Sequence, residues 1–391
     1  KLRLNKEKSE IEISAIESEI KSIKLDVKQK KDALARFTKD YNLAKNKLNK
    51  LDRTKPNNIA LYYAGGSKGS IGGGLVKVNR LQSVFREHKY GFNLVYNLSN
   101  WSLLNESAIN SLRSQKIPIV HNQNGTFYRA WYKGDCEWEN QNMAKTYHAA
   151  NYVFFQSEFC RMAAAYHLGE RKGPSEVLYN AVDTDFFWPR ETKTKNKSLI
   201  FLITGKIDSS TWHRVHCALE ALKLAVAEKR KFKIIIAGWL SSQVKQFLAK
   251  AIKEYKLSEY VSYSGPYSQD EAPAIYHQAD AYMMLKHQDP CPNTVIEAMS
   301  CGLPVLYSDT GGVAELVGES AGVGLHCETS WEEAHTPSPE CILTGMKHIE
   351  VGLSKMSKEA RQRACERFGI DLWMERHRKI FSSLIQSNDI T

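Results

Sequence analysis

The chain has 391 residues, 42% of them hydrophobic, and a formal net charge of +11. That length exceeds what one ordinary core fills and favours two α/β domains with an extension. The eight cysteines are scattered without a C-x-x-C pair, which argues against a disulfide framework or structural zinc and favours a reducing cytosol. No apolar run approaches the ~18–20 residues that span a bilayer, and no signal peptide is recognisable. Because the chain starts at Lys1 instead of methionine, we expect it to be a piece of a longer protein.

Most of the excess positive charge lies in the first 55 residues. They contain sixteen Lys/Arg and nine Asp/Glu, a net charge of +7, which leaves +4 for the rest. We find neither a nucleic-acid-binding module nor basic residues interleaved with aromatics, so no nucleic-acid partner is expected. A solvated helix face is the preferred interpretation, and weak attraction to an anionic membrane surface stays open.

Residues 1–55 are predicted to form a long coiled-coil helix. The segment up to residue 52 has no Gly or Pro, and its apolar residues alternate three- and four-residue steps. This spacing favours a left-handed coiled coil, and we expect a homo-oligomer formed through it. The alternative is a helix folded back on its own globular body. The apolar positions are Ile13, Ile16, Ile20, Ile23, Val27, Leu34, Phe37, Tyr41, Ala44, Leu48 and Leu51.

A nucleotide-type α/β unit is predicted to follow the linker around Pro56. A buried strand at Ile59–Ala64 precedes a glycine-rich turn, and an amphipathic helix extends over about 75–87. The turn lacks the G-x-G-x-x-G spacing, and no acid follows it at the distance that would bind a ribose, so an NAD-dependent enzyme is disfavoured.

The remaining apolar runs predict two parallel-sheet domains, residues 56–195 and 196–391. Short buried runs alternate with helical stretches, and the polar segment 190–197 separates two such series. A final helix over about 371–385 is expected to cross back to the first domain. The expected strands begin at about residues 59, 93, 117 and 152 in the first domain and 199, 233, 261, 281 and 304 in the second.

The segment 289–305 contains the most informative pattern of the chain. Asp289 and Glu297 stand eight positions apart, before and inside a predicted helix that starts near Pro292, Asn293 and Thr294. A helix N-terminus offers free backbone N–H groups to a phosphate, and the two acids can accept hydrogen bonds from hydroxyls on either side of it. A sugar nucleotide has this order of groups.

This segment resembles the E-x7-E signature of retaining glycosyltransferases of family 4, which have the GT-B fold. The resemblance covers roughly residues 58–385 and implies two Rossmann-like, doubly wound domains facing a cleft. It implies that the first acid, here Asp289 instead of Glu, contacts the transferred sugar. Glu297 would bind the ribose of the nucleotide.

Further residues are assigned by the same resemblance. It places the glycines Gly72, Gly73 and Gly74 near the donor phosphate, and Gly311 and Gly312 near the diphosphate. His121, at the end of the Ile117–Val120 strand, would lie near the transferred sugar. The family's two cations would correspond to Lys206 and Arg214, although His213 takes the second position in a strict count.

We therefore expect a retaining, metal-independent hexosyltransferase that uses a nucleotide-diphosphate sugar. Its acceptor would be a glycan or glycolipid in surface-polysaccharide assembly, in the cytoplasm or at the inner face of the cell membrane. We expect no cofactor and no metal, and Asp183-Thr184-Asp185 is interpreted as structural. The alternatives are a coiled-coil scaffold with an inactive transferase domain and a GT-B nucleotide-sugar epimerase.

Overall fold

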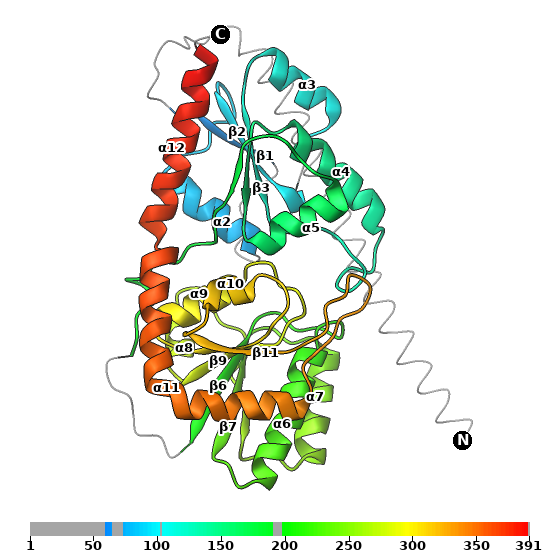
Figure 1. Ribbon diagram of the computed structural model, residues 1–391, viewed down its shortest axis with the longest axis vertical. Helices are drawn as coiled ribbons and strands as arrows, with labels where there is room; N and C mark the ends of the chain where they lie inside the picture. Colours follow the sequence, from blue (N-terminus) through cyan, green and yellow to red (C-terminus); the bar gives the residue numbers. More distant parts are fainter. Residues whose placement is uncertain (1–58, 65–72, 102–103, 191–197, 390–391) are drawn as a thin grey trace, which may run out of the picture. The chain divides into compact units, whose positions relative to one another are not determined.

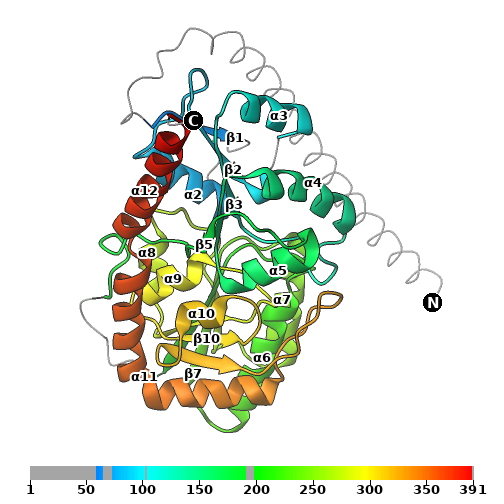
Figure 2. The same ribbon diagram turned by 45° about the horizontal axis from the view of Figure 1, so that its top comes forward.

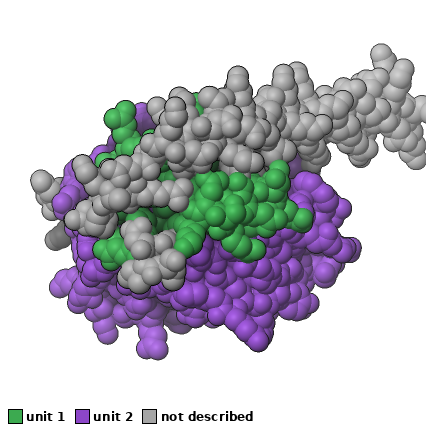
Figure 3. All heavy atoms as spheres, turned by 90° about the horizontal axis from the view of Figure 1, so that it is seen from above, with its two compact units in different colours: residues 1–120, 382–391 green, residues 121–381 purple. Residues whose placement is uncertain are grey.

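The computed structural model describes residues 59–64, 73–101, 104–190 and 198–389 (Figure 1). The predicted coiled-coil helix, Gly72 and the linker 191–197 lie outside these residues. The chain divides into two compact units, residues 1–120 with 382–391 and residues 121–381 (Figure 3).

The first sheet has five strands in the order β1-β2-β3-β4-β5. β1 pairs with β2 in parallel, with Leu61 opposite Leu94, and β4 pairs in the same way with β5. β1, β2 and β4 are runs of mainly Leu, Val, Tyr and Phe without alternation and are almost entirely buried, as in a sheet covered on both faces, whereas β5 is partly exposed. The strands are β1 (Leu61–Ala64), β2 (Leu94–Leu98), β3 (Ile119–Gln123), β4 (Tyr152–Phe155) and β5 (Ser175–Val177).

In the described part of the chain, four α-helices accompany these strands, and three of them begin at a side chain that caps the first turn. Asn105, Asp135 and Ser157 accept the backbone N–H three residues on, which satisfies a donor that the helix leaves without a partner. The helices are α2 (Gly73–Gln82), α3 (Glu106–Ser114), α4 (Cys136–Ala149) and α5 (Glu158–Leu168), and a short 3-10 helix, η2 (Ser99–Trp101), follows β2.

The second sheet has six strands in the order β11-β10-β9-β6-β7-β8. Neighbouring strands of this sheet pair in parallel, and β6 lies between β7 and β9. The strands are β6 (Leu199–Thr204), β7 (Phe232–Ala237), β8 (Val261–Tyr263), β9 (Ala281–Met284), β10 (Val305–Ser308) and β11 (Gly322–Leu325).

Helices cover both faces of this sheet, as Figures 1 and 2 show. One apolar cluster joins the sheet to α6 (His213–Ala227), α7 (Ser242–Glu254) and the first half of α11 (Pro339–Phe368). The other joins it to α8 (Ala272–Tyr276), α9 (Asn293–Ser300), α10 (Val313–Val317) and the second half of α11. α11 reaches both clusters because it changes direction along its length (Figure 1). The prediction of two parallel-sheet α/β domains is confirmed.

The last helix, α12 (Ile370–Asp389), contacts strands of the first sheet. Arg376 pairs with Glu176 of β5 at 2.7 Å, and the His377 ring lies 4.6 Å from the ring of Phe154 in β4. The first sheet ends at Val177 and the second begins at Leu199, so the predicted boundary at 195–196 lies between them. The compact units instead divide inside β3.

Candidate functional site

The loop between β9 and α9 is fixed against the loop that follows β10. Gln288 has a left-handed backbone (φ 47°), and its N–H donates to Thr310 Oγ1 at 2.9 Å. The N–H of Gly312 donates to the carbonyl of Asp289, also at 2.9 Å. These bonds hold the backbone of Asp289 in one place.

Gly311 and Gly312 are glycines because the two loops pack backbone to backbone. A Cβ on Gly311, whose φ is 76°, would lie 2.7 Å from the carbonyl oxygen of Asp289. One on Gly312 would overlap the carbonyl oxygen of Pro290. Their structural role is thus to let the Asp289 loop approach, and their predicted place beside a diphosphate stays a prediction.

The Asp289 side chain is turned inward. It is 13% exposed, and Oδ2 pairs with Lys286 Nζ at 2.8 Å. Oδ1 accepts the N–H of Cys291 at 3.3 Å. A charge partner on one oxygen and a backbone donor on the other fix the carboxylate at the start of α9.

Glu297 is buried on α9 among tyrosines. Its Oε2 accepts from the Tyr276 hydroxyl at 3.0 Å, and Oε1 accepts from Gln269 Nε2 at 3.4 Å. Burial first, then the Glu297 charge, raises the pKa of Tyr276 well above its ordinary value. Tyr282 lies nearby and bonds Thr204 Oγ1 at 2.9 Å. Sequence reasoning missed both tyrosines, since a Tyr within an apolar run looks like any core aromatic.

α9 begins without a side-chain cap. Pro292 occupies the N-cap position, and Asn293 and Thr294 form the first turn. The Oδ1 atom of Asn293 is buried without a hydrogen-bond partner in the described part of the chain. The helix thus begins where the sequence predicted, and the binding of a phosphate at its N-terminus stays a prediction.

Arg214 brings a buried positive charge to the same region. Its Nη2 donates to the carbonyl of Lys206 at 3.1 Å, while Nε has no partner among the described residues. Burial lowers the pKa of the guanidinium, and the charges of Tyr282 and Asp289 act against that shift. Lys206 itself is exposed, and its Nζ lies 5.1 Å from the ring centroid of Trp239.

Several buried polar atoms without a hydrogen-bond partner in the described residues come from the end of β10 or from the loops and helices that follow β6 and β9. These loops leave the carboxyl ends of neighbouring parallel strands, which is where open α/β sheets bind ligands. Native proteins leave few buried polar atoms unsatisfied, so this group indicates a ligand site. The atoms are His213 Nε2, Arg214 Nε, Gln288 Oε1, Asn293 Oδ1 and Ser308 Oγ.

His121 differs from its predicted position. β3 continues to Gln123, so His121 stands within the strand and not at its end, and its side chain is fully buried. Its Nε2 lies 2.8 Å from Gln123 Oε1, and its ring makes an edge contact with Tyr147. Burial lowers its pKa to about 4, so the ring is neutral at physiological pH. Its predicted role beside the transferred sugar stays a prediction.

The predicted glycines of the first sheet lie outside the compact unit that contains this site. Gly72 lies outside the described residues, and Gly73 and Gly74 are the first residues of α2. They belong to the other compact unit. Of the predicted site residues that the structure describes, those from 206 to 312 gather, and His121 and this pair are not shown among them.

Two contacts that the sequence did not reveal tie the β9–α9 and β10–α10 region to the segments around β4 and β5. Glu315 of α10 accepts the N–H groups of Glu158 and Phe159 at 2.7 and 2.9 Å and the hydroxyl of Tyr179 at 3.1 Å. Asn180 donates to the carbonyl of Cys291 at 2.8 Å. Nothing in the local sequence of Glu315 points to α5.

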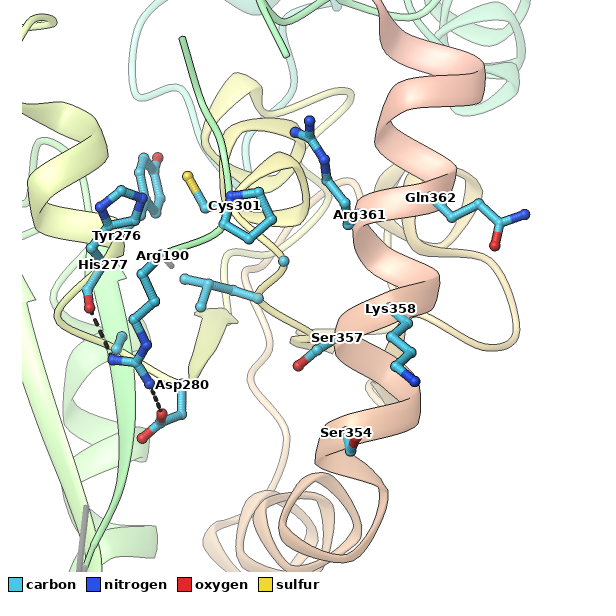
Figure 4. Close-up of a pocket in the computed structure, with 14 residues that line it drawn as sticks. Arg190, Tyr276, His277, Asp280, Cys301, Ser354, Ser357, Lys358, Arg361 and Gln362 are labelled. Atoms are coloured by element: carbon cyan, nitrogen blue, oxygen red, sulfur yellow. Dashed lines mark hydrogen bonds and ion pairs between the residues drawn. The ribbon is translucent and has the colours of Figure 1, made fainter. Parts of the chain in front are cut away.

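A pocket of about 490 Å³ lies behind α9 (Figure 4). Tyr276, the partner of Glu297, forms part of its wall together with Cys301 at the end of α9. Arg190 crosses one side, bonded to Asp280 and to the carbonyl of His277. On the other side Arg361 donates through Nη1 to the carbonyls of Thr184, Phe187 and Ser300. The arginines of this pocket are thus occupied by structural bonds.

Among the described residues, no group of three or more His, Cys, Asp or Glu could hold a metal ion. Asp183 accepts the N–H groups of Asp185 and Phe186, each at 3.0 Å, and so closes its own turn. The predicted absence of a metal and of a cofactor stays a prediction.

Residues 185–336 match the family model described as "Glycosyl transferases group 1". Over 144 residues the chain is 26% identical to a GDP-mannose:cellobiosyl-diphosphopolyprenol alpha-mannosyltransferase of Xanthomonas campestris. The match covers 37% of this chain and 37% of that relative. A protein of the same description from Xanthomonas oryzae matches equally. The chain thus aligns with little more than a third of these relatives.

Solved structures resemble the chain over most of its length. Sucrose-phosphate synthase from Thermosynechococcus elongatus superposes with a TM-score of 0.62 at 17% identity, covering 76% of this chain and 75% of that one. Anabaena HepE, solved with UDP and glucose, gives 0.63 at 14% identity and covers 83% and 99%. The predicted GT-B fold is confirmed.

Proposed function

We propose that the chain is a retaining glycosyltransferase that moves a hexose-type sugar from a nucleotide-diphosphate sugar to a hydroxyl acceptor. The observation that carries the proposal is the position of Arg214. Its guanidinium is buried, its Nε has no partner among the described residues, and its charge interacts with Asp289 in the loop before the uncapped α9, so the region fits an anionic ligand. The matched family segment contains all of these residues.

The donor is expected to lie across the carboxyl ends of β6, β9 and β10. Its diphosphate would meet Arg214, Lys206 and the first turn of α9. A ribose hydroxyl would replace the long bond from Gln269 to Glu297, and a sugar hydroxyl would donate to Asp289. Because Asp289 is fixed by Lys286 and a backbone N–H, the donor sugar would meet a rigid acceptor group.

The main catalytic task of the protein is to stabilise the leaving diphosphate. Negative charge accumulates on it as the glycosidic bond breaks, and fixed cations in a site shielded from water stabilise that charge most. The acceptor oxygen then forms the new bond on the face that the diphosphate leaves. The acceptor proton passes to a diphosphate oxygen, which makes retention possible without a covalent intermediate on the protein.

The chemistry of the site defines the donor and the acceptor only by class. Among the proteins that resemble the chain, one is named for GDP-mannose and another was solved with UDP and glucose, so both bases belong in the assay. We further propose a glycan or glycolipid acceptor and a cytoplasmic location at or near the inner membrane face. In the described part of the chain, no helix is long and apolar enough to cross a bilayer.

The test is turnover with UDP- and GDP-hexoses and a panel of glycans. Free nucleotide should appear only when an acceptor is present, and proton NMR of the first product should show the anomeric configuration of the donor. Asp289→Ala should lose activity by about a hundredfold or more while its unfolding curve is unchanged. Near-normal activity of Asp289→Ala contradicts the assignment.

The rival functions give different readings in the same experiment. An epimerase would convert the donor sugar without an acceptor. An inactive scaffold would bind no nucleotide sugar in calorimetry. A product with inverted anomeric configuration would still identify a glycosyltransferase, but it would contradict the same-face mechanism.

A further inference from the structure

A second pocket, of about 790 Å³, lies beside the donor region. Its walls come from the loop after β3, from α4 and α5, and from residues 326–338, which connect β11 to α11. We call these residues the 326–338 segment. Trp331 of this segment reaches the pocket, and its carbonyl accepts the N–H of Ala130 at 2.9 Å.

One side of the pocket is aromatic. The ring of Trp331 stacks on Tyr166 with centroids 5.7 Å apart and planes 22° from parallel, and it meets Tyr128 edge-on at 4.7 Å. Tyr166 is nevertheless 69% exposed. An exposed aromatic held flat by a second ring offers a rigid apolar surface to a ligand at little cost in side-chain entropy.

The other side is polar and mainly acidic. Asp135, Glu137 and Glu332 line it, and Arg129 is the one Lys or Arg among its described lining residues. The exposed Arg129 lies 3.6 Å from the exposed Glu332, so the three carboxylates outnumber the guanidinium by two. Amides of Asn140 and Gln141 complete this side. The surplus of carboxylates disfavours an anionic ligand and provides acceptors for hydroxyl groups.

Residues at two sides of the pocket form hydrogen bonds with the loop that contains Asp289. The hydroxyl of Tyr128 donates to the carbonyl of Gln288 at 3.2 Å. His287 bonds the carbonyl of Ser330 at 3.0 Å, next to Trp331. A molecule bound in the pocket would therefore lie close to the residue that is proposed to hold the donor sugar.

We propose that this pocket binds a neutral saccharide unit of the acceptor, with one sugar face on Tyr166 and its hydroxyls toward the carboxylates. A pyranose has a C–H face and a rim of hydroxyls, and the pocket has an aromatic side and an acidic side to match. The identification of this saccharide as the acceptor rests on the proposed function. Its binding to the pocket does not depend on turnover.

The experiment measures binding of cellobiose, maltose and glucose 1-phosphate to the whole chain by saturation-transfer NMR titration. Both neutral disaccharides are probes, and glucose 1-phosphate is the anionic comparator. We expect binding of a neutral disaccharide in preference to the phosphate. In Tyr166→Ala the Kd should rise about tenfold, while in Tyr166→Phe it should stay within about twofold.

Trp138→Ala is the matched control, because Trp138 is 59% exposed on α4 and does not line the pocket. Its binding should equal that of the unaltered chain. Absence of saccharide binding up to the solubility limit, equal affinity in Tyr166→Ala, or preference for glucose 1-phosphate overturns the proposal. Calorimetry with UDP and GDP on the same samples reports the donor site separately, so failure of one proposal is distinguished from failure of the other.

Discussion

Replacement of Arg214 by methionine should separate ligand binding from stability. The guanidinium has five N–H donors, yet within the described residues Nη2 bonds the carbonyl of Lys206 and Nε has no partner. A buried charge with so few partners costs desolvation energy that an apolar side chain avoids. We therefore expect Arg214→Met to keep the free energy of unfolding or raise it by about 1 kcal/mol.

The same change should remove the anion partner. Loss of a charge-assisted contact to a diphosphate is expected to weaken UDP or GDP binding about a hundredfold, which corresponds to about 2.7 kcal/mol. Urea denaturation without ligand and calorimetry with each nucleotide measure the two effects on the same sample.

Arg361→Met is the matched control. Arg361 donates to three backbone carbonyls around the end of α9 and the turn before Arg190, so its loss leaves buried acceptors unsatisfied. We expect a loss of about 2–3 kcal/mol in the free energy of unfolding with nucleotide affinity unchanged. If Arg214→Met instead loses stability and keeps its affinity for nucleotide, Arg214 is a structural residue and the reasoning is refuted.

Two further predictions concern His121 and Glu315. Burial lowers the pKa of His121 from 6.5 to about 4. Between these two pH values the unfolded chain therefore binds a proton at this residue and the folded chain does not. The free energy of unfolding should fall by about 2 kcal/mol from pH 7 to pH 5 through this group and level off below about pH 4, and His121→Asn should flatten that part of the profile. Glu315→Ala should lose about 1–2 kcal/mol, since three donors lose their acceptor. Burial and then Glu315 raise the pKa of Tyr179 to about 12, so ultraviolet titration of the variant should show a lower pKa.

Each of these has a contrary outcome. A stability profile of His121→Asn that matches the unaltered chain between pH 5 and pH 7 would mean that His121 takes up its proton without cost. An unchanged Tyr179 titration in Glu315→Ala would mean that the carboxylate does not bond the phenol in solution.

The sheets and the helix that carries Glu297 could be predicted because their signals are local. The run Leu199–Thr204 has no polar residue before its end, so only a strand buried on both faces accommodates it. The change from the Pro292 turn to a helix likewise lies within a few residues. By contrast, α11 was not predicted, because its apolar residues serve one cluster in the first half and another in the second. No single helical face stands out in the sequence.

The parts of the site that depend on distant residues could not be predicted. Tyr276 meets Glu297 across 21 positions, and Glu315 meets Phe159 across 156. The sequence predicts His121 at a strand end because it follows the apolar run Ile117–Val120 and precedes a polar segment. The structure instead supplies Gln123 as a buried partner, which removes the reason for ending the strand there.

A crystal structure of the chain soaked with a UDP- or GDP-hexose tests the central claim most directly. The diphosphate oxygens should lie within hydrogen-bond distance of Arg214 and the first turn of α9, with the hexose against Asp289 and the ribose against Glu297. A nucleotide bound elsewhere, with Arg214 and the start of α9 left without a ligand, would contradict the account.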